Sequence, residues 1–562
     1  MNNSTRSLHR IFILLISFCL TYGAQAQSNA AAEKVAGAMQ LIKVAYVDSV
    51  NSDKLAEEAI IAMLKSLDPH SSYISRDDLK AANEGLEGSF EGIGIQFQIF
   101  QDTILVISPI AGGPSEKLGI QAGDRIITID GKNVANIKIK NEDVMKQLRG
   151  PKGTKVNVAI LKVGSSKVVN YTINRDKIPL YSVDASYMIN PTTGYIKVNR
   201  FSQTTTDEFN KALAKLRDAG MQSMILDLSG NGGGIMQAAI EMADNFLSES
   251  KLIVYSEGLS APKQVFNATT RGMYESGKLV VMIDEGSASA SEIVTGALQD
   301  WDRALVVGRR SFGKGLVQKP FRLSDGSEIR LTIQRYYTPV GRCIQKSYAA
   351  GTEDYYKDFE NRYNHGEFMN ADSIHFADSL KYFTPNKRVV YGGGGIMPDL
   401  FVPIDTTYKS EYLTNIYRSG ALNQFTTNYV DKNRSKLKVA YLTVDDFVQT
   451  FSVNNAIMDE FRAFADKAKP EEDDAVQNEA TKNTKDKVTA KKPAETPPKE
   501  NKEEGFKRSR PIIENQIKAR IASELFGNDA MYRVFNEMNP IYKKAVESMN
   551  DATFTKMKVN TH

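Results

Sequence analysis

The chain has 562 residues, which is too long for one hydrophobic core and predicts roughly three or four domains. Hydrophobic residues make up 41% and charged residues 25%, as in ordinary globular proteins, and the net charge of +4 is spread along the chain instead of forming one basic block. This pattern argues against nucleic acid as a partner. The two cysteines and the scattered histidines have no zinc-ligand spacing, so we do not expect a metal enzyme.

Residues 1–26 predict a secretory signal peptide, because two arginines precede an apolar run over residues 11–20 and a small-residue cleavage site follows. The alternatives are an uncleaved anchor, for which the run is short, and a lipid attached at Cys19, for which the preceding phenylalanine is too bulky. We expect the mature chain to begin near Gln27. We also expect export, into the periplasm where the cell has an outer membrane, as a soluble or peripherally membrane-associated protein. Cleavage would leave Cys343 as the only cysteine, so no intramolecular disulfide is expected.

An N-terminal helical segment is predicted over residues 27–87, because apolar residues recur there at helical intervals. Residues 88–177 change to short β-rich runs broken by glycine and aspartate turns, which indicates a compact β-rich module. Residues 178–405 alternate apolar strands with amphipathic helices, which is typical of an α/β layered core. Within this core, the polar and aromatic residues 348–387 have no clean period and are interpreted as an insertion.

The C-terminal part of the chain is predicted in three pieces. Residues 406–467 are interpreted as a C-terminal extension that follows the core and whose role stays open. Residues 468–510 are rich in Lys, Glu, Asp, Thr and Pro and have too few aliphatic residues to offset the entropy of ordering, which predicts a disordered charged linker. Residues 511–562 resume helical periodicity and predict a separate C-terminal helical piece.

A strand, a glycine turn with three serines and a helix follow one another over residues 279–298. A serine at such a turn is held out at a sharp corner, where N–H groups at the helix start can stabilise an oxyanion. Serines are also common helix caps, and these residues alone favour the capping role.

Lys314 stands between two glycines, which favours a lysine threaded into a tight pocket over a solvated surface charge. A buried lysine whose pKa falls from about 10.4 towards neutrality can act as the base that a serine nucleophile needs. Gln318 follows on the same stretch and could orient the amine by accepting a hydrogen bond from it. A Ser/His/Asp triad is the weaker alternative, because no histidine has a comparable context.

Two glycine stretches could present backbone amides to an anion. Residues 223–234 are a predicted strand that ends in a glycine cluster, which suits an oxyanion better than a phosphate because the Lys and Ser/Thr of the phosphate-loop pattern are missing. In the β-rich module, the start of a strand could hold a terminal carboxylate while its edge pairs with a peptide, although a plain β-turn fits equally well. This second stretch comprises Gly92, Ile93, Gly94 and Ile95.

Together these stretches resemble the carboxyl-terminal processing peptidases, also called tail-specific proteases. The resemblance runs from about Leu55 to Pro403 and rests on motifs that occur in the family's order. The motifs are LDPHSSYIS, GIGIQF, AGDRIITIDG, LDLSGNGGG, GSASASEIVTGALQD, SFGKGLVQ, DGSEIRLTIQRYYTPVGRCIQ and GGGGIMPDLFVP.

The resemblance implies a serine peptidase with a crotonase-like α/β core and a PDZ domain in the β-rich module. It assigns the nucleophile to Ser289, the general base to Lys314 and an orienting role to Gln318, at the family's spacings. It also places the oxyanion donors on the backbone amides of Gly233 and Ala290. The PDZ domain of the family binds substrate C-termini and can gate the active site.

One departure from the family concerns the glycine cluster. Many members have Arg at the position of Ser229, and Pro or another residue at the position of Gly232. The departure bears on the geometry of this loop and leaves the dyad intact.

The sequence therefore predicts an exported serine endopeptidase that cleaves proteins near their C-termini through a Ser289/Lys314 dyad. Protein or peptide substrates bound by their C-termini are the expected partners, and an activating or adaptor protein and a homo-oligomer are both compatible with this prediction. Two rivals stay open. One is a PDZ scaffold that binds peptides without cleaving them, and the other is a crotonase-type acyl-CoA enzyme, for which no CoA-directed feature stands out.

Overall fold

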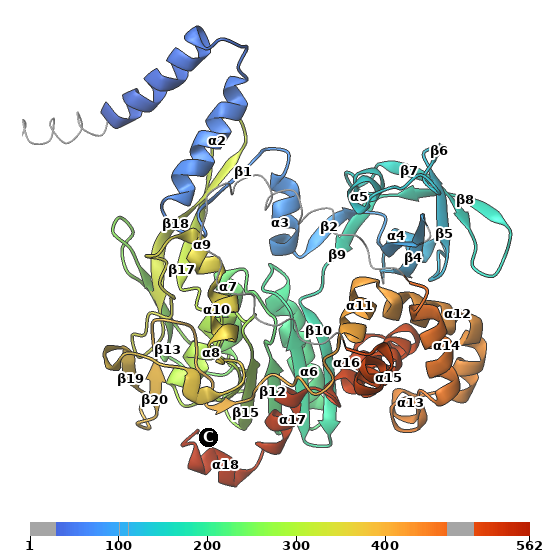
Figure 1. Cartoon of the computed structure of the whole chain (residues 1–562). Helices are drawn as coiled ribbons and strands as arrows, with labels where there is room; N and C mark the ends of the chain where they lie inside the picture. The colour runs from blue at the N-terminus through green and yellow to red at the C-terminus, as the bar shows by residue number, and fades with distance from the viewer. Residues whose placement is uncertain (1–29, 101, 111, 469–499, 562) are drawn as a thin grey trace, which may run out of the picture. The chain divides into compact units, whose positions relative to one another are not determined.

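The computed structural model of the protein describes residues 30–100, 102–110, 112–468 and 500–561 (Figure 1). The signal peptide expected over residues 1–26 lies outside the described residues, as does most of the linker expected over 468–510. The chain divides into two compact units. The first unit contains the described residues up to Leu79 together with Gln318–Thr332 and Tyr348–Tyr356, and the second contains the rest.

In the N-terminal segment that is predicted to be helical, the first unit contains a helix over residues 30–45 and α2 (Ser52–Lys65). Asn51 caps α2, because its side chain accepts the backbone N–H groups of the first helical turn. A short strand that the sequence does not predict, β1 (Ser72–Ile74), pairs antiparallel with the first residues of β18 (Glu328–Tyr337). The N-terminal segment is therefore not purely helical.

In the second unit, residues 89–179 fold into short strands and two short helices, as the β-rich pattern predicts. The sheet has the strand order β3-β4-β5-β7-β8, with β6 added beside β5 and β3 at one edge. A separate pair, β2 with β9, joins the two ends of this module. The elements are β2 (Ser89–Gly92), β3 (Ile95–Phe100), β4 (Thr103–Pro109), α4 (Pro114–Lys117), β5 (Arg125–Ile129), β6 (Lys132–Asn133), α5 (Asn141–Leu148), β7 (Lys155–Leu161), β8 (Val168–Asn174) and β9 (Asp176–Pro179).

The core of the second unit is a six-stranded sheet in the order β10-β11-β12-β15-β16-β21. β10 and β11 pair antiparallel, and every other pair of neighbours in this sheet is parallel. The strands are β10 (Val183–Asn190), β11 (Thr193–Val198), β12 (Ser223–Asp227), β15 (Lys278–Ile283), β16 (Leu305–Gly308) and β21 (Leu400–Phe401).

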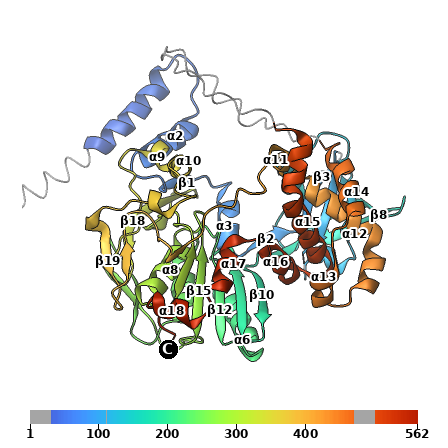
Figure 2. The same ribbon diagram turned by 60° about the horizontal axis from the view of Figure 1, so that its bottom comes forward.

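Both faces of this sheet are covered, because successive residues of a strand point to opposite sides. On β15, Leu279, Val281 and Ile283 belong to a core that the sheet shares with α6, α7 and α8. Val280 and Met282 belong to a second core that the sheet shares with α17 and α18, the red helices beside the green strands in Figures 1 and 2. These helices are α6 (Thr205–Asp218), α7 (Met236–Asp244), α8 (Ala290–Asp300), α17 (Pro540–Glu547) and α18 (Asp551–Lys556).

Three loops leave the same edge of the core sheet. Because β12, β15 and β16 are adjacent and parallel, their carboxyl ends meet at one edge, which is where ligands bind in sheets of this kind. The glycine loop (residues 228–235) follows β12, the serine loop (residues 284–289) follows β15 and the lysine loop (residues 309–315) follows β16. The topology therefore gathers the three candidate stretches of the core in one place.

The C-terminal residues do not form the separate helical piece that the sequence predicts over 511–562. Helices α15 and α16 pack with α11 to α14 around one core, whereas α17 and α18 pack on the core sheet. The same helical periodicity suits either surface, so the pattern alone does not show that the segment is divided. The helices are α11 (Glu411–Arg418), α12 (Ala421–Ala440), α13 (Val444–Thr450), α14 (Asn455–Ala465), α15 (Lys502–Phe526) and α16 (Asn528–Asn536), and α11 to α16 are called the helical domain below.

The prediction that the linker extends to residue 510 is also wrong, because α15 begins at Lys502. Asn501 caps this helix by accepting the N–H of Glu503 at 3.0 Å. The first turns of α15 are charged, which is why they resemble a linker, but they bury Phe506 edge-on against Tyr412 of α11. One well-placed aromatic side chain anchors a stretch that composition alone assigns to disorder.

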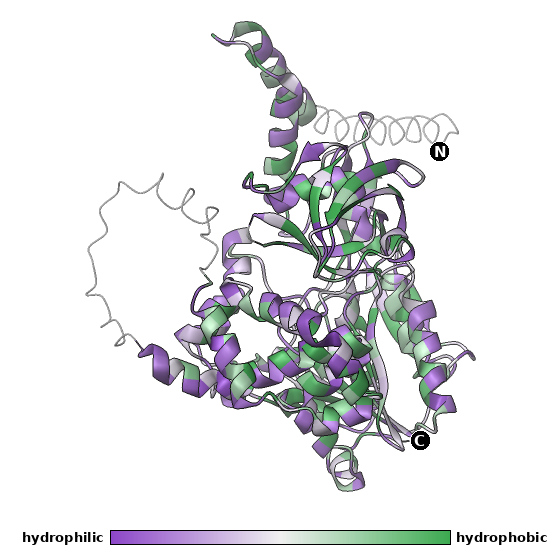
Figure 3. Cartoon of the chain, turned by 90° about the vertical axis from the view of Figure 1, so that its right-hand side faces the viewer, coloured by the Kyte–Doolittle hydropathy of each residue, from purple (hydrophilic) through white to green (hydrophobic). Residues whose placement is uncertain are grey.

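The residues predicted as an aperiodic insertion, 348–387, contain two helices that the sequence does not predict, α9 (Thr352–Tyr356) and α10 (Asp358–Asn364). Helices of five and seven residues are too short to show a period. In Figure 3, which is coloured by hydropathy, many of the longer helices alternate between hydrophobic and hydrophilic residues, as helices that bury one face do.

Candidate active site

Ser289 occupies a strained turn at the start of α8. Its backbone has φ 55° and ψ −110°, and a non-glycine residue with positive φ persists only where its surroundings fix it. The serine N–H donates to the Glu292 carboxylate at 2.7 Å, and the serine carbonyl accepts from the Tyr336 hydroxyl at 3.0 Å. The turn is therefore fixed from both sides by buried side chains.

The other two serines of this stretch have structural contacts that distinguish them from Ser289. Ser287 donates its hydroxyl to the carbonyl of Leu228, and Ser291 donates to the carbonyl of Asn231, both at 2.8 Å. Both side chains are fully buried and tie the serine loop and α8 to the glycine loop, whereas Ser289 is partly exposed. Among the three serines, Ser289 is thus the one accessible to a substrate.

Lys314 lies between two glycines that the packing requires. A Cβ at Gly313, where φ is 90°, would lie 3.0 Å from the backbone nitrogen of Gly395. A Cβ at Gly315 would lie 2.9 Å from the backbone nitrogen of Gln345, whose side chain accepts the Gly315 N–H at 2.7 Å. The lysine loop is therefore closely packed on both sides of Lys314.

The carboxylate of Glu292 joins the serine loop to the lysine loop. It is fully buried on the first turn of α8 and accepts backbone N–H groups of Ser289 at 2.7 Å, Gly313 at 2.7 Å and Lys314 at 2.9 Å. It also accepts the hydroxyl of Ser311 at 2.5 Å. Burial raises the pKa of Glu292 to about 7, although these hydrogen bonds act in the opposite direction because they favour the ionised form.

The glycine loop lies directly against the serine turn. Gly233 has φ 95°, and a Cβ there would lie 2.8 Å from the Cβ of Ser289 and 2.9 Å from the amide nitrogen of Ala290. The structure thus brings together Ser289 and the two predicted oxyanion donors. The N–H of Gly233, however, donates to the side-chain oxygen of Asn231 at 2.9 Å, so in this conformation the loop uses it internally.

The departure at Ser229 is accommodated by a buried lysine. Lys197 of β11 forms an ion pair with Asp227 at 3.1 Å and also donates to the carbonyl oxygen of Ser229. Asp227 further accepts the N–H of Ser229 at 2.8 Å and the hydroxyl of Tyr195 at 2.6 Å. The start of the glycine loop is therefore anchored from beneath, with Lys197 supplying the positive charge beside Asp227.

Gln318 lies on β17 (Leu316–Arg322) and belongs to the first unit. Its side-chain amide donates to the carbonyl oxygen of His70. The His70 ring in turn is hydrogen-bonded to the Tyr355 hydroxyl at 2.8 Å, and Asp68 accepts the N–H groups of His70 and Ser71 at 2.8 Å each. The LDPHSSY motif thus forms a turn that fixes the amide of Gln318.

The second predicted glycine stretch has a conformation suited to a carboxylate. The carbonyl of Ile93 accepts the Ser115 hydroxyl at 2.6 Å, and the carbonyl of Gly94 accepts the N–H of Ile110 at 2.9 Å. In a trans peptide the N–H points opposite to the carbonyl, so the N–H groups of Gly94 and Ile95 point away from these partners. They lie at the start of β3, the edge strand of its sheet, where a peptide could add as a further strand.

Comparisons with known proteins assign parts of the chain to four families. Residues 192–355 match the model of peptidase family S41, and residues 84–161 match the PDZ domain. Residues 20–78 match the N-terminal domain of the activating protease CtpB, and residues 412–527 match a family of unknown function.

Two curated relatives come from Bacillus subtilis (strain 168). The carboxy-terminal processing protease CtpB is 37% identical over 330 residues, which are 58% of this chain and 68% of that protein. The carboxy-terminal processing protease CtpA is 36% identical over 315 residues, which are 56% of this chain and 66% of that protein. The chain belongs to the carboxy-terminal processing proteases of family S41. A solved photosystem II D1 C-terminal processing protease is 26% identical, with a TM-score of 0.34 over 65% of this chain and 92% of that one.

Two residues that hold the protease's loops were missed by reasoning from the sequence. Glu292 stands three residues after Ser289, and this Ser-x-x-Glu spacing is the sequence signature of a capping box, which would have drawn attention to it. Tyr336 is distant in sequence from both loops that it contacts, and no local pattern indicates its role. The structure adds both residues to the candidate site.

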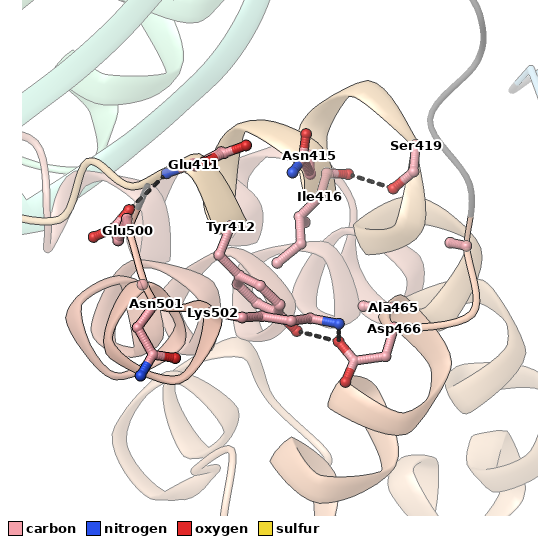
Figure 4. Close-up of a pocket in the computed structure, with 12 residues that line it drawn as sticks. Glu411, Tyr412, Asn415, Ile416, Ser419, Ala465, Asp466, Glu500, Asn501 and Lys502 are labelled. Atoms are coloured by element: carbon pink, nitrogen blue, oxygen red, sulfur yellow. Dashed lines mark hydrogen bonds and ion pairs between the residues drawn. The ribbon is translucent and has the colours of Figure 1, made fainter. Parts of the chain in front are cut away.

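The protease's helical domain contains a pocket of about 360 Å³ (Figure 4). The residues that line it come from the helical domain and its flanks and not from the three loops. At its centre Asp466, the residue that caps the C-terminus of α14, accepts the Tyr412 hydroxyl at 3.2 Å and pairs with Lys502 of α15 at 3.0 Å. These contacts join three helices, so we interpret the cluster as structural.

Across the described part of the protease, no helix is long and apolar enough to span a membrane.

Proposed function

We propose that this protease is an exported endopeptidase that cuts proteins near their C-termini, with Ser289 as nucleophile and Lys314 as general base. The observation that carries the proposal is the shared carboxylate of Glu292, which accepts the backbone N–H groups of both residues. A nucleophile and its base must stay in fixed relative positions to react. The Ser289 turn and its partial exposure support the same assignment.

In the acylation step, the Ser289 hydroxyl oxygen attacks the carbonyl carbon of the scissile peptide bond, and the neutral amine of Lys314 accepts the hydroxyl proton. The tetrahedral intermediate then collapses. The C–N bond breaks, the ammonium of Lys314 returns the proton to the leaving amine, and the substrate's N-terminal part stays on Ser289 as an ester.

In the deacylation step, Lys314 accepts a proton from water, and the resulting hydroxide attacks the ester carbonyl. The second tetrahedral intermediate expels the serine oxygen, which recovers its proton from Lys314. Ser289 and Lys314 thus return to their starting states without any cofactor. Gln318 supports the lysine by accepting a hydrogen bond through its amide oxygen, since its amide nitrogen is used at His70.

The backbone amides of Gly233 and Ala290 are the proposed oxyanion donors. Their closeness to Ser289 supports this role. Because Asn231 already accepts the Gly233 N–H, the loop has to exchange this internal acceptor for the oxyanion during the reaction. We therefore expect substrate binding to be accompanied by a small rearrangement of the glycine loop.

The PDZ domain is proposed to capture the substrate's C-terminus. Gly92, Ile93, Gly94 and Ile95 form the carboxylate loop, and the substrate adds to the edge of β3 with an apolar terminal side chain in an adjoining pocket. Amidation of the terminal carboxylate should therefore slow cleavage of a good substrate. An equal cleavage rate for the amidated and the free peptide would contradict this part of the proposal.

Further features of the proposal concern the whole protein. We infer a crotonase-like arrangement for the α/β core, from the parallel sheet with helices on both faces. We also infer export through the signal peptide to the periplasm of a cell with an outer membrane. The match of residues 20–78 to the N-terminal domain of an activating protease is compatible with an activating or adaptor partner, or with a homo-oligomer.

The test compares the wild type with Ser289→Ala and Lys314→Ala on an unfolded protein substrate, with products sized by mass spectrometry and folding checked by circular dichroism. Cleavage by the wild type alone, while both variants stay folded, supports the dyad. Undiminished cleavage by either variant would overturn it. If the wild type is inert and still binds C-terminal peptides, the non-cleaving PDZ scaffold becomes the better explanation.

A further inference from the structure

The hydroxyl of Tyr336 bridges the two loops that carry the proposed dyad. Tyr336 lies near the end of β18, and its oxygen is 3.0 Å from the carbonyl oxygen of Ser289 and 2.6 Å from that of Lys314. Both acceptors are carbonyls, so the phenol is the donor to each, and its single proton is shared between them. One atom therefore holds the backbone of both residues.

Tyr336 and Glu292 form complementary clamps on Ser289 and Lys314. Glu292 accepts the backbone N–H of both residues, and Tyr336 donates to the carbonyl of both. Each residue is thus held at the two peptide groups that flank its side chain. Two clamps at different peptide groups restrict rotation of each backbone segment, which one clamp alone would allow.

The surroundings of Tyr336 make it a rigid support. Its side chain is only 1% exposed and belongs to the large core beneath α6, α7 and α8. The backbone N–H of Tyr336 donates to the carbonyl of Gly315 at 3.0 Å, which ties β18 to the lysine loop a second time. A packed ring on a strand presents its hydroxyl with little freedom to move.

The strain at Ser289 gives this bridge a consequence for reactivity. A non-glycine residue with φ of 55° relaxes towards negative φ unless contacts on both sides prevent it. Loss of the contact to the Ser289 carbonyl removes one of these contacts. The serine side chain would then swing relative to Lys314, and a displacement of about 1 Å in a reacting group can cost about a hundredfold in rate.

We propose that Tyr336 is a positioning residue for the Ser289/Lys314 dyad, acting through the carbonyls of both residues. This inference rests on the proposed function, because it concerns the geometry of that dyad. It extends the site by a residue whose hydroxyl holds the backbone of both members of the dyad.

The test is Tyr336→Phe, which removes one oxygen and keeps the ring in the core. We expect kcat to fall about 10- to 100-fold while KM and the affinity for a C-terminal peptide stay unchanged. Labelling of Ser289 by a serine-directed fluorophosphonate should slow by a similar factor. The matched control is Tyr337→Phe, since the neighbouring ring stacks on Tyr255 with centroids 4.8 Å apart and contacts neither carbonyl in the structure.

The outcomes separate this inference from the proposed function. If Ser289→Ala is as active as the wild type, the dyad itself is wrong. If the dyad stands and Tyr336→Phe keeps the wild-type kcat, the positioning role is wrong. The role is also wrong if the loss of kcat merely equals the fraction of unfolded protein measured by circular dichroism, or if Tyr337→Phe causes the same loss.

Discussion

Two loops of this protease are proposed to handle peptides, and they are held in different ways. The serine turn is fixed by the buried side chains of Glu292 and Tyr336, which occupy N–H and carbonyl groups on both sides of Ser289. The carboxylate loop of the PDZ domain is held through the carbonyls of Ile93 and Gly94, which direct the following N–H groups outwards. The first loop fixes one reactive atom, and the second presents donors to a ligand.

This difference teaches that bond cleavage and ligand capture place different demands on a backbone. The rate of reaction between two groups falls steeply when either is displaced, so the loops that carry a reactive pair are each fixed by several contacts. Capture of a carboxylate needs donors in roughly the right direction, and the arriving chain supplies the remaining order. Substitutions in the serine region should therefore change kcat, and substitutions in the carboxylate loop should change KM.

The largest effect is expected for Lys314→Met, which removes the amine and keeps the stem. Loss of a general base lowers kcat by about 10²- to 10⁴-fold. Steady-state kinetics on a peptide substrate would measure the loss, and calorimetry should show unchanged binding of a C-terminal peptide. Lys319→Met, at an exposed lysine on the same strand as Gln318, is the matched control and should keep full activity.

A loss of about a hundredfold in kcat is expected for Glu292→Gln, because the amide can offer only one acceptor oxygen to four donors and places its own N–H groups against the others. The activity of the wild type should also depend on pH through the protonation of Glu292. Protonation of Glu292 below its pKa of about 7 converts one of its oxygens from acceptor to donor, so the clamp weakens and wild-type activity falls as pH falls.

The raised pKa of Glu292 also makes the free energy of unfolding depend on pH, in the direction opposite to the activity. The folded pKa of about 7 lies above the ordinary value of 4.5, so between these values the folded state binds more protons than the unfolded state. The contribution of Glu292 to the free energy of unfolding therefore decreases as pH rises from 4.5 to 7 and is constant outside that window. Thermal unfolding measured across this pH range should show that the free energy of unfolding of the wild type decreases with pH. The control variant Glu241→Gln on α7 should keep this pH dependence. If the pH dependence also persists in Glu292→Gln, its assignment to Glu292 is contradicted.

A smaller effect, of about tenfold on peptide affinity, is expected for Gly94→Ala. Gly94 has φ 73°, and a Cβ there would lie 2.9 Å from the Cδ1 of Ile178, so the Ile178 side chain or the loop must shift. Calorimetry with a C-terminal peptide would show the loss, while kcat on a saturating substrate should stay unchanged. Gly119→Ala is the matched control, because Gly119 has a similar φ of 76° with open space around it.

The smallest effect is expected for Ser229→Ala. The Ser229 hydroxyl is buried without a hydrogen-bond partner in the described structure, whereas the contacts of its backbone to Asp227 and Lys197 do not depend on the side chain. Activity should stay within about twofold, and the free energy of unfolding should change by less than about 1 kcal/mol. A large loss in either quantity would show that the side chain acts in the glycine loop.

The sequence allowed prediction of the parts of the site that local pattern encodes. Glycines around Lys314 and a glycine cluster before Ile235 indicate close backbone packing, and the order of strands and helices indicates a layered α/β core. It could not indicate that the Gly233 N–H is already used by Asn231, because that contact depends on the fold of the loop. Tyr336 was missed for the same reason, since its partners come from two loops distant in sequence.

The C-terminal helices show a different limit. Apolar residues recur at helical intervals in α15 and in α17, but this pattern does not indicate which surface buries them. Ile517 of α15 packs within the helical domain, and Ile541 of α17 packs on the core sheet. An isoleucine in a helix is equally suited to either core, so only the tertiary structure separates them.

The placement of α17 and α18 has a consequence for how the protease is made. Val280 and Met282 are synthesised long before Ile541 and Phe554, which complete the core on their side of the sheet. During synthesis the strands that carry the three loops therefore lack one of their two layers until α17 and α18 emerge. The three loops therefore rest on a sheet that is fully covered only after segments more than 250 residues apart in the sequence have come together.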